Sequence, residues 1–273
     1  MARHMKVAAW LDAGVAILQR DARLYFSYRT RVVSQLLQTL VSLTLFYYVS
    51  RLVRVPAFGT PDRYFAFVVV GLVILELLTA TLALLPMTIR QELVAGTFER
   101  VVVSPLGPVW AVTSMVMFPI SFSLVLGAVT IMFAAVIFGM PIAGATAVLA
   151  LPVAVLAALA LAPLALGVSA AVLVVKQAGT AATFAVTLIS LIGGFFFPIA
   201  LLPSWIRWTA DVQPVTPILD LLRHLVVGTP LTSSAWLTML KVVGFAAILL
   251  PASMFALRAA VNISRRRGTI IEY

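Results

Sequence analysis

Apolar residues fill six long stretches of the chain, and most charged residues lie in the segments between them. A helix needs about 20 predominantly apolar residues to cross a bilayer core about 30 Å thick. A helix also satisfies all of its backbone hydrogen bonds within one segment, as a chain in lipid must. The pattern therefore predicts an all-α, polytopic membrane protein with six transmembrane helices. These are expected at 32–55, 64–86, 109–138, 147–175, 180–202 and 235–257.

An amphipathic pattern precedes the first apolar stretch. At 100° per residue, the apolar residues between 7 and 26, Trp10 and Tyr25 among them, share one broad face, and Gln19, Arg20 and Arg23 lie opposite. Such a helix can lie in the headgroup layer of a membrane, or it can pack against a soluble partner. Periodicity alone does not distinguish the two.

The spans and the segments around them divide the chain into three parts. We expect an N-terminal cytoplasmic interfacial helix at 1–31 and a six-span transmembrane domain at 32–257, with a cytoplasmic loop at 87–108. A basic cytoplasmic tail follows at 258–273. Each segment outside the spans is too short to bury a core of its own.

Composition agrees with a membrane protein. Hydrophobic residues make up 63% of the chain, charged residues 10%, and mean hydropathy is +1.12. A soluble domain with so apolar a surface would aggregate. The chain has no cysteine and two histidines, so we expect no disulfide and no zinc or haem site.

Positive charges predict the orientation of the chain. With both termini in the cytoplasm, thirteen lysines and arginines lie inside and six outside, as the positive-inside rule requires. We therefore expect a multi-pass protein of the cell inner membrane with both termini cytoplasmic. The net charge of +10 is not interleaved with aromatic residues, so no nucleic-acid partner is expected. The inner residues are Arg3, Lys6, Arg20, Arg23, Arg29, Arg31, Arg90, Arg100, Lys176, Arg258, Arg265, Arg266 and Arg267, and the outer ones are Arg51, Arg54, Arg63, Arg207, Arg223 and Lys241.

Glu76 is an acidic residue deep in the second span. Inserting it costs about 3 kcal/mol, which its apolar neighbours offset with about 2–5 kcal/mol. A carboxyl at this depth usually faces a cavity or a partner, so we predict that Glu76 lines the transport route or the permease interface rather than lipid. A protonated Glu76 that is hydrogen-bonded to another helix is an equally good interpretation.

Charged residues gather again in the loop after the second span, between Arg90 and Arg100. Gly96 can end one helix, Thr97 can cap the next, and Pro105 can stop that helix and redirect the chain. A cluster of this kind is either a solvated turn or a docking surface for a soluble partner.

Prolines interrupt the segment between the fifth and sixth spans. Pro198, Pro203, Pro214 and Pro217 exclude one continuous helix, so we expect short re-entrant or interfacial helices near the outer surface. Trp205 and Trp208 are expected at headgroup level, and Arg207, Asp211, Asp220 and Arg223 near water. Phe195, Phe196 and Phe197 would then line the route or contact lipid.

Two of these segments resemble one known family. The run from Glu92 to Pro105, with its Gly-Thr-Phe-Glu centre and Ser-Pro end, resembles the loop between the second and third spans of type-2 ATP-binding-cassette (ABC) exporter permeases. That group includes drug-resistance permeases and O-antigen and teichoic acid exporters. The run from Gly193 to Trp205, followed by Gln213-Pro214, Pro217 and Arg223, resembles the end of the family's fifth span and the segment after it.

The resemblance implies that the loop docks on a separate ATPase subunit and transmits its movement to the spans. The residues it assigns to coupling are Glu92, Gly96, Thr97, Glu99, Arg100, Ser104 and Pro105. It also implies a permease that moves an amphipathic, lipid-linked or drug-like substrate outward. An ATP-independent secondary transporter or channel that uses Glu76 is the alternative.

The chain has no phosphate-binding loop of the type that holds ATP. We therefore expect no cofactor and no enzymatic activity in this chain, with ATP and Mg bound by the partner ATPase. Six spans make a small pore wall, which favours two permease copies, as a homodimer, with two ATPase subunits. Small residues in the alanine-rich fourth span suit such an interface, although packing within one chain would use them equally well.

Overall fold

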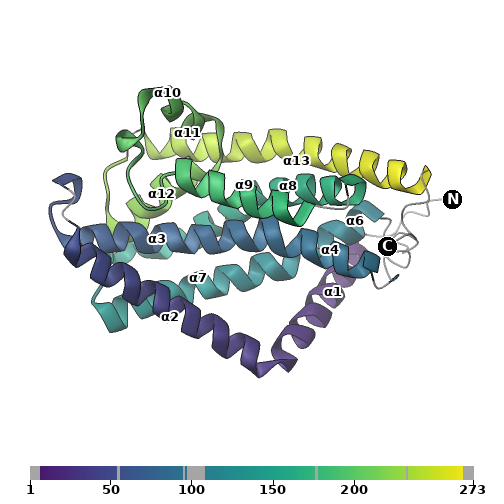
Figure 1. The fold of residues 1–273 in the computed structure, drawn as a ribbon, viewed down its shortest axis with the longest axis horizontal. Coiled ribbons are helices and arrows are strands. Elements are labelled where there is room, and N and C mark those ends of the chain that lie inside the picture. The colour runs from purple at the N-terminus through teal and green to yellow at the C-terminus, as the bar shows by residue number, and fades with distance from the viewer. Residues whose placement is uncertain are drawn as a thin grey trace.

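The computed structural model describes residues 7–53, 56–94, 96, 108–175, 178–231 and 233–266. These residues form a bundle of helices that run mostly along one direction (Figure 1). The longer helices are α1 (Val7–Ser27), α2 (Arg29–Leu52), α3 (Pro61–Thr79), α4 (Leu85–Val94), α6 (Pro108–Met115), α7 (Met117–Phe138), α8 (Ala150–Val175), α9 (Ala178–Ile192), α12 (Val215–Val227) and α13 (Ala235–Arg266). The shorter ones are η1 (Pro56–Phe58), η2 (Ala80–Leu84), η3 (Gly144–Leu149), η4 (Ile199–Leu201), α10 (Ser204–Arg207) and α11 (Thr209–Val212).

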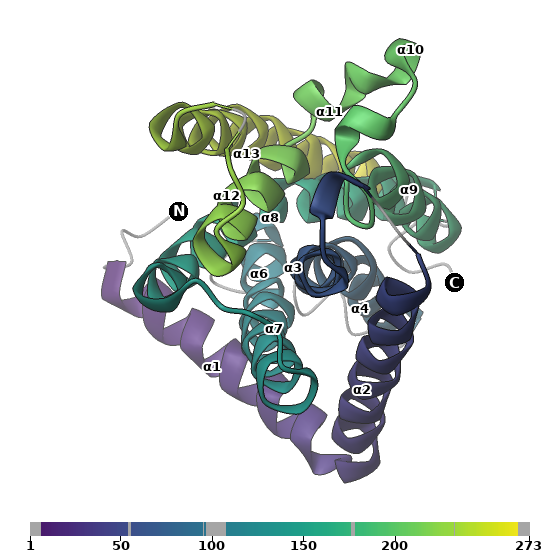
Figure 2. The same cartoon turned by 90° about the vertical axis from the view of Figure 1, so that its left-hand side faces the viewer.

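Helix α3 lies at the centre of the bundle, with α2, α7, α9 and α12 against it (Figure 2). Its consecutive residues from Phe65 to Gly71 are all buried, so the helix is covered on every side over this stretch. A helix that is apolar all round suits such a place. The groups carried by α3 therefore face other helices.

A second pair, α8 and α13, packs side by side along much of its length (Figure 1). The alanines of α8 at 157, 158, 160 and 165 are buried, and such small side chains let neighbouring backbones approach. Near the end of the pair, the Ser264 hydroxyl donates to the Leu173 carbonyl at 2.8 Å. Helix α13 continues to Arg266, beyond the predicted end of the last span at 257.

Five helices in the described part of the chain are long and apolar enough to cross a membrane. They are Arg29–Leu52, Pro61–Glu92, Trp110–Phe138, Gly144–Leu173 and Ala235–Ser264. The predicted span at 180–202 is represented by α9, which has 15 residues and is about 22 Å long at about 1.5 Å per residue. The helix ends because Gly194 takes a left-handed φ of +78° and Pro198 cannot continue it. The count of six spans is therefore not confirmed.

The N-terminal segment is helical, as α1, whereas its predicted amphipathic character is not confirmed. Tyr28 has φ −99° and ψ 84°, outside the helical region, and α1 therefore leaves α2 at a sharp angle (Figures 1 and 2). Tyr25 of α1 packs against Phe118 and Phe122 of α7, with ring centroids 5.5 and 4.5 Å apart. The helix is thus anchored on the bundle, and its position at a membrane surface stays a prediction.

Helix α3 passes into α4 through η2, a π-helical segment of five residues, Ala80–Leu84. The Thr81 hydroxyl donates to the Leu77 carbonyl at its start. Segments of this type are frequent at functional sites. The second span therefore continues as a helix to Val94, into the region predicted as the start of the cytoplasmic loop.

Candidate functional site

Three helices meet at the carboxyl group of Glu76. The Thr39 hydroxyl of α2 lies 3.5 Å from Glu76 Oε1, and the Thr130 hydroxyl of α7 lies 3.4 Å from Oε2. Both threonines are buried, at 3% and 1% exposure. The carboxyl of Glu76 is thus hydrogen-bonded to other helices, as in the second interpretation of the sequence. Its place on a transport route stays a prediction.

The hydrogen-bonding capacity of Thr130 bears on the state of Glu76. A threonine hydroxyl has one hydrogen to donate, and Thr130 lies closer to its own helix's Leu126 carbonyl, at 2.9 Å, than to Glu76. If the Thr130 hydroxyl donates its hydrogen to the Leu126 carbonyl, it can only accept a hydrogen bond from Glu76. A protonated Glu76 carboxyl would donate that bond to Thr130. A glutamine amide at position 76 offers the same donor.

The helices around Glu76 are held at close distance. A Cβ atom added to Gly127 of α7 would lie 2.7 Å from Val73 Cγ1 of α3, so a larger residue there would require Val73 to move or the two helices to separate. Gly127 thus allows the close packing of α7 on α3 beside the contact between Thr130 and Glu76.

We expect Glu76→Gln to keep expression and thermal stability while it changes substrate-stimulated activity. The amide keeps the size and the donor of a protonated carboxyl but cannot lose a proton. Glu76→Leu leaves the Thr39 and Thr130 hydroxyls without this partner and should lower the free energy of unfolding by about 1–3 kcal/mol. ATP hydrolysis by the reconstituted complex, measured with several substrates, checks the first variant. An unchanged profile across all of them would leave Glu76 a structural residue.

Arg223 of α12 forms a second polar centre inside the bundle. Its side chain is 3% exposed; Nε donates to the Phe67 carbonyl of α3 at 3.2 Å, and Nη2 donates to the Phe195 carbonyl at 2.8 Å. The guanidinium carbon lies 3.3 Å from the centroid of the Phe67 ring, a cation–π contact. Asp220, one turn earlier, adds a favourable carboxylate charge.

The prediction that Arg223 lies near water is therefore wrong. The chain forms a turn after α9. The buried carbonyls of this turn have no helical N–H partners, so they need other hydrogen-bond donors. Arg223 provides one of them and ties α12, α3 and this turn together.

The three consecutive phenylalanines lie in different surroundings. Phe195 is fully buried in the core, and the ring of Phe196 stacks on Phe46 of α2 with centroids 5.4 Å apart and an interplanar angle of 9°. Phe197 is half-buried. A Cβ atom added to Gly71 of α3 would lie 2.2 Å from the Phe195 carbonyl oxygen, so α3 passes directly against this backbone. Their role in a route stays a prediction.

The segment after the turn contains the short helices η4, α10 and α11 before α12. Trp205 and Trp208 project outward, with 73% and 62% of their surface exposed. Arg207 Nη2 donates to the carbonyls of Ala200 and Leu202 at 3.0 and 2.9 Å. Pro203 is exposed, whereas Pro214 and Pro217 are buried at the start of α12. The interrupted structure agrees with the proline pattern, and its depth in a membrane stays a prediction.

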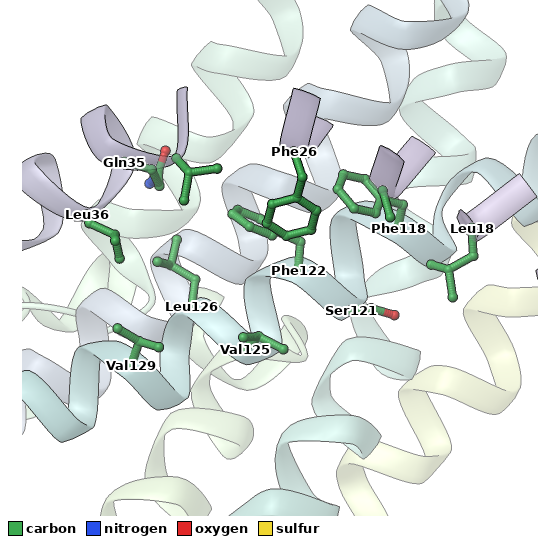
Figure 3. Close-up of a pocket in the computed structure, with 12 residues that line it drawn as sticks. Leu18, Phe26, Gln35, Leu36, Phe118, Ser121, Phe122, Val125, Leu126 and Val129 are labelled. Atoms are coloured by element: carbon green, nitrogen blue, oxygen red, sulfur yellow. The ribbon is translucent and has the colours of Figure 1, made fainter. Parts of the chain in front are cut away.

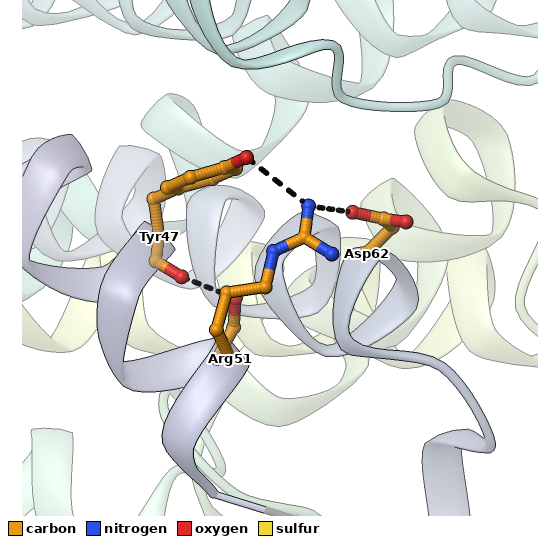
Figure 4. A network of polar contacts seen from close by, with 4 residues as sticks. Tyr47, Arg51 and Asp62 are labelled. Atoms are coloured by element: carbon orange, nitrogen blue, oxygen red, sulfur yellow. Dashed lines mark hydrogen bonds and ion pairs between the residues drawn. The ribbon is translucent and has the colours of Figure 1, made fainter.

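An exposed ion pair joins α2 and α3 at the same end of the bundle. Arg51 Nη2 lies 2.7 Å from Asp62 Oδ1 and donates to the Tyr47 hydroxyl at 3.2 Å (Figure 4). Its guanidinium also lies 4.8 Å from the centroid of the Tyr47 ring. These contacts fix the hairpin between the two helices.

The predicted coupling residues fall partly within the structure. Glu92 lies half-buried in α4, and Gly96 is exposed with a left-handed φ of +67°, a conformation that glycine adopts at little cost. This agrees with the expectation that a helix ends near Gly96. Thr97, Glu99, Arg100, Ser104 and Pro105 lie outside the described residues.

The family model described as ABC-2 type transporter matches residues 14–227, from α1 to the end of α12. The matched range includes Glu76, the loop after α4 and the turn held by Arg223. No curated protein matches the chain.

Proposed function

Because the chain belongs to the ABC-2 type transporter family, a family of transport permease components, we propose that it is the permease subunit of an ATP-driven exporter. It moves an amphipathic, lipid-linked or drug-like substrate outward across the cell inner membrane. The partners are two copies of an ABC ATPase and a second permease copy, which makes a homodimer. The family match over residues 14–227 carries this proposal, and it weighs against an ATP-independent transporter.

The arrangement of the helices supports a coupling role for the region predicted as the cytoplasmic loop, 87–108. The loop joins α4 to α6, and the two helices lie at the same end of the bundle as the C-terminal end of α13 (Figure 1). Helix α4 continues α3 through η2, and α6 continues into α7 after a turn at Val116. A push on the loop thus reaches α3 and α7 directly. These two helices carry Glu76 and Thr130, so movement of the ATPase would act on their contact.

Copurification with a candidate ABC ATPase of the same organism tests the proposal. We expect a stable complex whose ATP hydrolysis in lipid vesicles rises when an amphipathic or lipid-linked compound is added. The ATPase alone, and the complex with a hydrolysis-deficient ATPase, are the controls. Transport by the purified permease in the absence of any ATPase would overturn it.

The proposed orientation gives a labelling prediction. The chain has no cysteine, so Thr60→Cys and Thr229→Cys should react with an impermeant maleimide in intact cells, and Ser104→Cys only after permeabilisation. Helices α3 and α13 begin at the end of the bundle opposite to α4 and α6 (Figure 1). Thr229 contacts His224 Nδ1 through its backbone carbonyl, a contact that a changed side chain preserves. The reverse labelling pattern would invert the topology.

A further inference from the structure

An apolar groove of about 390 Å³ lies between α1, α2 and α7. It opens on the outside of the bundle, where Phe26 and Val125 are more than half exposed. Figure 3 shows Phe26 and Leu18 of α1 facing Phe118 and Phe122 of α7 across it. Gln35 and Ser121 are the polar residues in a lining that is otherwise apolar.

Arginines surround the corner between α1 and α2 beside this groove. Residues 20–31 contain four arginines and one acidic residue, Asp21, which pairs with Arg20 at 2.8 Å. Arg29 is exposed and shares a face of α2 with the groove residues Val32 and Leu36, three and seven positions later.

Arg31 is also exposed, and it lies next to the wall of the groove. Its guanidinium carbon is 5.5 Å from the centroid of the Tyr25 ring, and that ring packs 4.5 Å from the Phe122 ring. Burial raises the pKa of the Tyr25 hydroxyl above 10, and Arg31 opposes the shift. The phenol is therefore neutral at physiological pH and does not cancel the charge of Arg31.

A long apolar groove with uncompensated positive charge at one corner matches an anionic phospholipid. We propose that the groove binds one acyl chain of phosphatidylglycerol or a related anionic phospholipid, with its phosphate held by Arg29 and Arg31. The acyl chain would gain van der Waals contacts with the apolar lining, and basic pockets between membrane helices recognise anionic headgroups. The bound lipid would fasten α1 to α7. It is distinct from the exported substrate and does not require the ATPase.

Native mass spectrometry of the purified chain, with equal amounts of phosphatidylglycerol and phosphatidylethanolamine, tests the proposal. The wild-type chain should retain phosphatidylglycerol preferentially. The double variant Arg29→Gln, Arg31→Gln should bind it about 25-fold more weakly, since each arginine near an anionic headgroup contributes about fivefold. Arg63→Gln, which removes an exposed arginine at the start of α3, is the matched control and should bind as the wild type does.

A second variant tests the acyl chain separately. Val125 lines the groove and is 63% exposed, so Val125→Trp fills the groove without disturbing the core. It should lose phosphatidylglycerol with all arginines in place, and size-exclusion chromatography checks that it is folded.

Three results would overturn the proposal. The first is equal retention of the two lipids in the wild type and the arginine variant. The second is binding of glycerophosphoglycerol, which has no acyl chains, as tight as that of the intact lipid. The third is efficient disulfide formation between two copies of Val125→Cys in lipid, because a second chain would then occupy the groove.

Discussion

Replacement of Arg223 by leucine is expected to lower the free energy of unfolding by about 1–3 kcal/mol. The substitution removes both hydrogen bonds, but the Phe67 carbonyl keeps its bond within α3, whereas the buried Phe195 carbonyl loses the donor that Arg223 supplies, at a cost of about 1–3 kcal/mol. Leucine fills a similar volume, so the loss is not a simple cavity effect. Denaturant titration of the protein in mild detergent, followed by tryptophan fluorescence, measures it.

Arg207 provides a matched control because it also bonds two backbone carbonyls, those of Ala200 and Leu202. It is exposed, and water can replace the guanidinium, so Arg207→Leu should change stability by no more than about 0.5 kcal/mol. Equal losses in the two variants would show that burial of the carbonyls is not the source of the effect.

The second large effect is expected at the proposed interface with the ATPase. Glu99→Lys should weaken association of the ATPase by about 2–5 kcal/mol, which corresponds to at least about thirtyfold in the dissociation constant, because a desolvated charge pair is lost and reversed. Membrane insertion should be normal, since the residue lies in a loop between spans. Affinity purification of the ATPase with the variant permease, at several salt concentrations, measures the loss.

An acidic-to-lysine change at the other end of the bundle is the control that separates a loss of docking from a general effect of the altered charge. Asp211 of α11 is exposed, and Asp211→Lys should leave the yield of the complex unchanged. A wild-type yield and transport rate in Glu99→Lys would remove this glutamate from the interface.

The apolar pattern located the long helices well but misjudged one of them. The first span was predicted at 32–55 and α2 runs from Arg29 to Leu52, so the two agree within a few residues. The stretch at 180–202 is as apolar as the others, yet the helix ends at Ile192. Hydropathy records composition, whereas the break follows from the backbone conformation at Gly194.

The candidate site, too, could be predicted only in part. Glu76 could be singled out because a carboxyl is costly in lipid, whereas nothing in the sequence distinguishes Thr39 or Thr130, which lie 37 and 54 positions away. Threonines are common in apolar helices, and only the packing of α2 and α7 on α3 brings these two together. Arg223 was misplaced because its main partners are backbone carbonyls, which have no signature in the sequence.

At Gly71, helix α3 passes close to the Phe195 backbone, and this reverses the usual preference for alanine over glycine within a helix. Exchange of a mid-helix glycine for alanine usually favours the helix by about 1 kcal/mol. At Gly244 of α13 an added Cβ atom would meet nothing within 4 Å, so that rule should hold there. At Gly71 the same methyl group would displace the Phe195 carbonyl from Arg223, and the gain in propensity is outweighed. Two glycines in similar helical positions thus differ in mutational tolerance, and a residue-by-residue alanine scan of the chain would separate them.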